Sequence, residues 1–149
     1  MIEQEYFTFA KAFQAEHREL GCLVQRLRHT LGSGRTWSVS AAREARLVIG
    51  DLETHLHHHF AQEEEGGYLE QALVAAPRFS RQAGELLKQH PVLLTQVAEA
   101  MRAARLATSD ATAWPVLKQQ VKQLLGLLAA HEKAENALVQ EAFNSGFES

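Results

Sequence analysis

The chain has 149 residues and a formal charge of −3, so it offers no basic surface field for nucleic acid or anionic lipid. Its length suits a single domain with a sizeable core, which we expect to span residues 1–149. Cys22 is the only cysteine, which excludes an intramolecular disulfide and a thiolate metal cluster. We expect Cys22 to be buried or half-buried in the first helix.

The N-terminal segment carries acidic residues where a signal peptide needs positive charge, and no apolar run is long enough to span a bilayer. We therefore expect a cytoplasmic protein. Eight histidines stand out in the composition, and three of them are consecutive within helical sequence. That placement favours metal binding over an expression tag.

The first segment predicts a helix from about Glu3 to Leu31. Its apolar residues recur every three or four positions, and His17 fills the one gap in that stripe, so His17 should face the core. Glycines at positions 32 and 34 should end this helix, and Trp37 lies in the connection. The stripe comprises Tyr6, Phe9, Phe13, Leu20, Val24, Leu27 and Leu31.

A second helix should begin after a cap at Ser38 or Ser40 and run to about Glu65. An imidazole and a carboxylate continue its hydrophobic stripe, which reads Val48, Leu52, either His55 or Leu56, His59 and Glu63. Two glycines then break or bend the helix, and we expect a short helical stretch from Tyr68 to Ala76, stopped by Pro77.

A third helix is predicted from about Ser80 to Ala107. Pro91 cannot donate to the carbonyl of Leu87, so this helix should bend beside His90. Its inward positions are Ala83, Leu86 or Leu87, His90, Leu93 or Leu94, Val97 and Met101.

The fourth helix should be capped by Thr112, hold Pro115 in its first turn and extend to about Phe143. Its core positions are spaced alternately by four and three residues, and His131 and Glu135 interrupt this apolar stripe near its middle. We find no strand pattern. Four long helices joined by short turns predict an all-α, up-down-up-down antiparallel four-helix bundle.

The second and fourth helices each carry a histidine followed four residues later by a glutamate, which places both side chains on one helix face. A lone histidine precedes each pair by 41 or 42 residues, so one helix-pair unit is used twice. We predict that the two units bring six ligands to a common two-metal centre. The ligands are His17, His59 and Glu63 from the first unit and His90, His131 and Glu135 from the second.

Metal ions suit this set because buried carboxylates without partners cost several kcal/mol, and buried ion pairs often fail to recover their desolvation penalty. Imidazole and carboxylate ligands without thiolate favour two iron ions, with manganese or zinc as substitutes. If both glutamates bridge, an open position remains on the metal. A small exogenous ligand such as dioxygen, nitric oxide or peroxide can bind there.

These residues resemble the hemerythrin-like, or HHE cation-binding, domain family over essentially the whole chain. The resemblance rests on His17, the segment His59–Glu64, His90 and the segment His131–Glu135. It implies a four-helix bundle around an oxygen-bridged, non-haem di-iron centre.

Two features differ from the oxygen-carrying hemerythrins. Those carriers have a second histidine four residues before the one matched by His90, where this chain has Leu86. They also end with a histidine and an aspartate five residues apart, whereas His131 and Glu135 stand four apart. Both differences place the chain with the broader hemerythrin-like set, which is linked to iron handling, oxygen sensing, and nitric oxide or peroxide stress.

The other histidines have different expected roles. His55 shares the face of His59 and is either a fifth histidine ligand or a residue that packs beside the ligands, and we favour the second role. His29, His57 and His58 should be at the surface. Glu64 should form a cap or a hydrogen bond outside the ligand set. The aromatic residues, Phe60 among them, are expected in the core.

The sequence leaves three functions open. The first is a di-iron protein that binds or senses a small ligand or iron itself. The second is a di-iron enzyme that removes peroxide or nitric oxide. The third is a helical interaction module in which metal is structural or absent.

Overall fold

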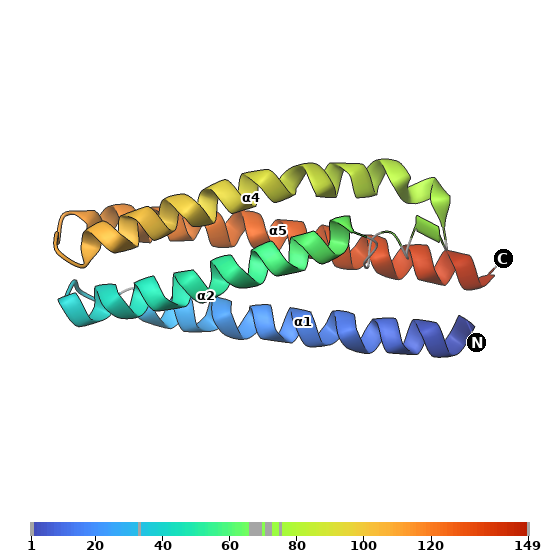
Figure 1. The fold of residues 1–149 in the computed structure, drawn as a ribbon, viewed down its shortest axis with the longest axis horizontal. Coiled ribbons are helices and arrows are strands. Elements are labelled where there is room, and N and C mark those ends of the chain that lie inside the picture. The colour runs from blue at the N-terminus through green and yellow to red at the C-terminus, as the bar shows by residue number, and fades with distance from the viewer. Residues whose placement is uncertain (1, 33, 66–69, 71–72, 75, 149) are drawn as a thin grey trace.

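The computed structural model describes residues 2–32, 34–65, 70, 73–74 and 76–148. Within these ranges the chain forms four long helices and no strand, and the helices run alternately in opposite directions with both termini at one end (Figure 1). The predicted all-α four-helix bundle is thus confirmed. The elements are α1 (Ile2–Leu31), α2 (Val39–Glu64), the 3-10 helix η1 (Pro77–Phe79), α4 (Ser80–Ala107) and α5 (Ala113–Glu148).

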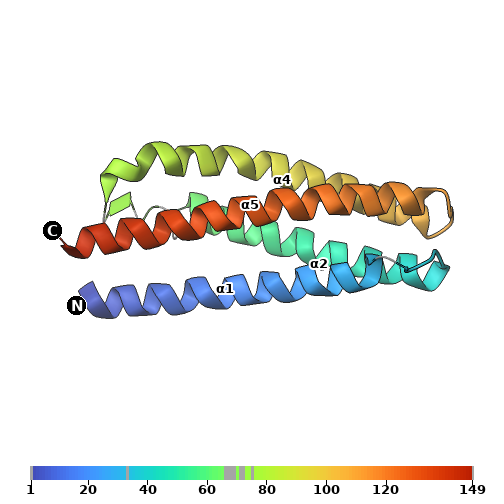
Figure 2. The same ribbon diagram turned by 180° about the vertical axis from the view of Figure 1, so that it is seen from behind.

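Packing follows the order of the chain. Helix α1 packs on α2, α2 on α4 and α4 on α5, whereas α1 and α5, side by side in Figure 2, pack least closely of the neighbouring pairs among the described residues. No described helix is both long and apolar enough to cross a membrane.

Local sequence signals set the helix ends. The Ser38 side chain accepts a hydrogen bond from the Ala41 N–H at 2.9 Å, as expected of a cap on α2. Before α5, the backbone N–H and the hydroxyl of Thr112 both bond to Asp110 Oδ1, at 2.9 and 2.6 Å. Helix α5 then continues past the predicted end at Phe143. Most of the stretch predicted between Tyr68 and Ala76 lies outside the described residues.

The apolar interior has two parts, which we name the large and the small cluster. The large cluster fills most of the bundle and contains the fully buried Leu27, Leu52 and Leu117. The small cluster lies toward the chain termini and includes Phe13, Leu86, Leu138 and Ala142. The inward positions predicted for α5 are all buried and belong to these clusters or lie between them. They are Leu117, Val121, Leu124, Leu128, His131, Glu135, Leu138 and Ala142. The alternation of four and three residues therefore identified the buried face correctly.

One expectation for α1 is wrong. Cys22 is exposed, because the buried face of α1 runs through Leu20, Leu23 and Leu27 and position 22 turns outward. Val24, predicted inward, is half-buried and packs against the large cluster. The side chains of the first ten residues, Tyr6 and Phe9 included, lie outside the described set.

Trp37 makes a hydrogen bond between two parts of the chain at the end of the bundle opposite the termini. Its indole N–H donates to the Ala107 carbonyl at 2.7 Å, which joins the α1–α2 connection to the end of α4. Pro91 lies inside α4 without ending the helix, and the predicted bend beside His90 stays a prediction.

Replacing Leu52 with alanine should lower the free energy of unfolding of the metal-free protein by about 2–5 kcal/mol, because a fully buried side chain would leave a cavity. Leu47 is the matched control, since it lies on the same helix and is 69% exposed. Leu47→Ala should change the free energy of unfolding by less than about 0.5 kcal/mol. Urea denaturation followed by circular dichroism measures both, and equal losses would contradict this assignment of the buried face.

Candidate metal centre

The six residues predicted as ligands meet between the large and the small cluster. Five of them are buried, and the side chain of His17 is 24% exposed. Each replaces an apolar residue in its helix stripe: His17 lies between Phe13 and Leu20, and His90 lies between Leu86 and Leu93. The helical period therefore aims all six at one level of the bundle.

Their donor atoms form two groups that share Glu135. Within each group, one donor atom from every residue lies within 4.8 Å of the others. A donor cluster of this size can hold a cation. One group comprises Glu63, His90, His131 and Glu135, and the other comprises His17, His59 and Glu135.

Glu63 also faces both groups, through its two oxygens. Its Oε1 lies 2.6 Å from His59 Nε2, and its Oε2 lies 2.9 Å from His90 Nε2. The side chain therefore reaches from the histidine of its own helix to that of α4.

Glu135 repeats this arrangement from α5. Its Oε1 lies 3.6 Å from His59 Nε2 and 3.8 Å from His17 Nε2, whereas its Oε2 lies 3.3 Å from His131 Nε2. The Oε1 atoms of both glutamates thus face one histidine pair and the Oε2 atoms face the other. Two carboxylates placed in this way can each bridge two cations.

Three of the four histidines contact an oxygen of a neighbouring helix through the outer nitrogen, Nδ1. A protonated Nδ1 that donates outward leaves Nε2 free to bind a metal with its lone pair. The sequence predicted such a hydrogen bond for Glu64 and missed Glu16 and Gln89. The contacts join His59 to Glu16, His90 to Glu64 at 3.1 Å, and His131 to Gln89 at 2.7 Å.

The charges of the centre shift its pKa values strongly. Burial lowers the pKa of His59, but hydrogen bonds and charges of Glu135 and Glu63 outweigh it and raise the pKa to about 11. The pKa of His90 is also raised, against the effect of burial, chiefly by Glu63. Burial raises the pKa of Glu135, but hydrogen bonds led by that of His131 lower it well below its usual range. The raised pKa values of His59 and His90 therefore favour protonated imidazoles beside the carboxylates when no metal is bound.

The Nε2 atoms and carboxylate oxygens that face the centre are suited to binding a metal and are poorly satisfied by one another. Of the four Nε2 atoms and four carboxylate oxygens, seven are buried and make no hydrogen bond of acceptable geometry within the described chain. Native proteins rarely leave buried polar atoms in that state. Imidazole nitrogens and carboxylate oxygens are ligands of iron, and also of manganese and zinc.

Phe60 covers the centre from the large cluster. Its ring stacks on His90 with a centroid separation of 3.9 Å and an interplanar angle of 6°, and it meets the His131 ring edge at 5.6 Å. This apolar wall excludes water from one side of the donor atoms.

The remaining polar residues of this region surround the donor groups. His55 stacks beside His59 at 6.1 Å, has Nδ1 3.9 Å from Glu19 Oε1, and belongs to neither group. Burial lowers its pKa. His29, His57 and His58 are exposed, as predicted. No sequence pattern pointed to Glu132, a half-buried residue of α5 whose pKa is raised by burial.

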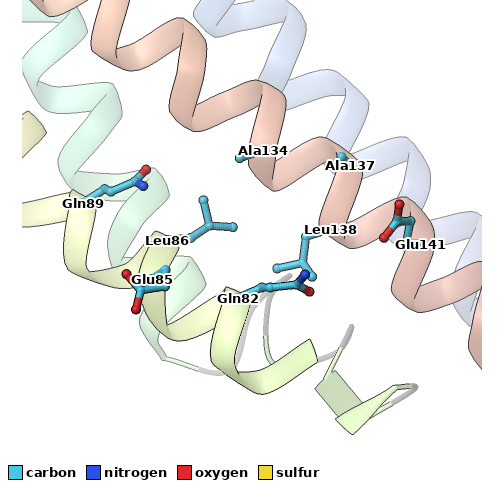
Figure 3. A pocket seen from close by; sticks show the side chains of 8 residues that line it. All are labelled: Gln82, Glu85, Leu86, Gln89, Ala134, Ala137, Leu138 and Glu141. Atoms are coloured by element: carbon cyan, nitrogen blue, oxygen red, sulfur yellow. The ribbon is translucent and has the colours of Figure 1, made fainter. Parts of the chain in front are cut away.

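A cavity of about 300 Å³ lies beside the centre, between α4 and α5. Figure 3 shows Leu86 and Leu138 extending between the two helices and Gln89 at one end of the cavity. Leu86 occupies the position where oxygen carriers have a histidine. Leu86 therefore places an apolar side chain where those carriers have a further ligand.

Comparison with known proteins gives one match. The family model described as Hemerythrin HHE cation binding domain matches residues 8–143, a range that contains all six residues of the centre. No curated protein and no solved structure matches the chain.

The Gln89→Ala variant should bind metal about 10–100-fold more weakly, because the outer nitrogen of His131 loses its protein acceptor. Gln82→Ala is the matched control: Gln82 lines the same cavity on α4, and no hydrogen bond joins it to a histidine in the described residues (Figure 3). Competition with a chelator of known affinity measures both. Equal affinity of the two variants would contradict a positioning role for Gln89.

Proposed function

Because the chain belongs to the hemerythrin HHE cation-binding domain family, we propose that its histidine and glutamate residues bind two metal ions, and that the ions are iron. One observation carries the proposal: Glu63 and Glu135 each direct one oxygen to each of two histidine pairs. A single ion would leave half of these buried atoms without a partner.

Each proposed site has two imidazoles and two carboxylate oxygens. His17 and His59 serve one ion, and His90 and His131 serve the other. Iron commonly takes six ligands, so four protein donors leave open positions for exogenous ligands. Bound iron would supply Lewis acidity and a change of oxidation state.

The chain positions the ligands and excludes water. Glu16, Glu64 and Gln89 hold the outer nitrogens of their histidines, so the inner nitrogens present lone pairs to the metal. Phe60 covers one side, and a small uncharged molecule can enter such an enclosure more readily than a large substrate.

We propose that the physiological role is to bind or sense dioxygen, nitric oxide, peroxide or iron itself. An enzyme that removes peroxide or nitric oxide is the alternative, since open metal positions also permit turnover. An exposed free cysteine suits a reducing compartment, so we propose a cytoplasmic location. We also propose that the chain forms a single domain.

Iron-loaded protein should contain two ions per chain. When free iron is at a hundredfold excess over the dissociation constant of each site, removing both ions with a chelator should lower the melting temperature by roughly 10–20 °C. Glu135→Ala should weaken both sites because Glu135 belongs to both donor groups, whereas His59→Ala should chiefly weaken one. His58→Ala is the matched control, an exposed histidine next to His59. Elemental analysis reading near zero, with unchanged melting, would instead support a metal-independent interaction module.

Kinetics separate the binder from the enzyme. For a binder or sensor, we expect iron-loaded protein to give a stoichiometric change in its near-ultraviolet charge-transfer absorption with nitric oxide or peroxide, and no turnover. Continuous loss of either reagent, abolished in His59→Ala and Glu135→Ala but retained in His58→Ala, would establish the enzyme instead.

A further inference from the structure

The contacts outside the donor groups repeat with the two halves of the chain. Glu16, the residue before His17, contacts Nδ1 of His59 and so crosses from α1 to α2. Gln89, the residue before His90, contacts Nδ1 of His131 and crosses from α4 to α5. We use the word seam for the line along which two neighbouring helices pack. Two of the four seams are therefore bridged by equivalent hydrogen bonds.

A third contact closes another seam, and its equivalent is missing. Glu64 follows Glu63 and crosses from α2 to His90 on α4. The repeat places Asn136, which follows Glu135, in the corresponding position on α5, where it would face His17 on α1. No hydrogen bond joins Asn136 to His17 in the described part of the chain.

Independent observations show that this seam is the weakest cover of the centre. His17 is the most exposed of the six residues, with 24% of its side chain accessible, against at most 4% for the others. Helices α1 and α5 also pack least closely of the neighbouring pairs in the described structure (Figure 2). The His17 side chain therefore brings the centre closest to solvent, although its Nε2 is itself buried.

A half-buried carboxylate of α5, that of Glu132, stands at this seam. Glu132 lies one helical turn before Asn136 on α5 and shares its face. Its Oε1 is buried and makes no hydrogen bond within the described residues. Glu132 directly follows His131 on α5, and the charges that act on its carboxylate include those of His17 and Glu135.

From this geometry we propose that metal ions enter and leave between α1 and α5, and that Glu132 is the first binding site for an incoming divalent cation. The cation then passes to His17 and Glu135, whose donor atoms lie 3.8 Å apart. None of the six ligand residues lines the cavity between α4 and α5, where Gln89 contacts the outer nitrogen of His131. The inference rests on the proposed two-metal function.

Metal exchange kinetics test the proposal. Cobalt(II) uptake by metal-free, full-length protein is followed by stopped-flow visible absorption, and release is followed by transfer to excess EDTA. Glu132→Gln should slow uptake and release alike, by about tenfold, because it removes the receiving charge. Affinity and the two-ion stoichiometry should be unchanged. Glu99→Gln, which removes the same charge from an exposed site on α4, should exchange at the wild-type rate.

A second variant adds the missing contact. Asn136→Glu reproduces on α5 what Glu64 provides on α2, and should slow release by holding His17. Two-ion binding with wild-type rates in Glu132→Gln would overturn the proposed route while leaving the metal centre intact. A loss of affinity in Glu132→Gln would make Glu132 a ligand and overturn its role as a receiving site. Slower loading in His55→Ala would place the route between α1 and α2, and absence of metal binding by the wild type would overturn both proposals.

Discussion

Two carboxylates buried in a leucine-rich interior are the constraint on which this structure depends. Glu63 and Glu135 are 2% and 1% exposed, and an isolated charge at such depth would normally be neutralised by a proton. The lowered pKa of Glu135 and the raised pKa of His59 indicate that the surroundings instead supply positive charge. Protonated imidazoles can do this, and metal ions can do it at the same atoms. The centre is therefore a site at which cations and protons compete.

The residues that stabilise the fold are separate from the charged residues of the centre. The large cluster lies on one side of the centre and contains most of the fully buried side chains, including Leu27, Leu52 and Leu117. The small cluster, with Phe13 and Leu138, closes the bundle on the other side. Because hydrophobic burial away from the centre supplies most of the folding free energy, the donor atoms can stay poorly satisfied without unfolding the bundle.

Helical periodicity made the fold and the six central residues predictable, because it determines which face each side chain occupies. His131 and Glu135 could be placed because they interrupt an otherwise unbroken apolar stripe. Contacts between helices depend on how each helix is rotated against its neighbour, which spacing within one helix does not determine. Glu16 and Gln89 were missed for that reason, although both directly precede a predicted ligand. The prediction for Cys22 was wrong for the same reason, because spacing alone does not show whether position 22 or position 23 lies at the edge of the buried face of α1.

The two halves of the chain carry the same types of ligand and differ in the residues just outside them. The first half carries carboxylates at Glu16 and Glu64, and the second half carries amides at Gln89 and Asn136. A carboxylate acceptor makes a histidine a stronger ligand than a neutral acceptor does, so exchanging acids for amides weakens the hold on the histidines they face. The two carboxylates serve histidines of different donor groups. Each proposed ion therefore has one firmly held and one loosely held imidazole. In the group nearer α1, the loosely held residue is His17, which is also the most exposed to solvent.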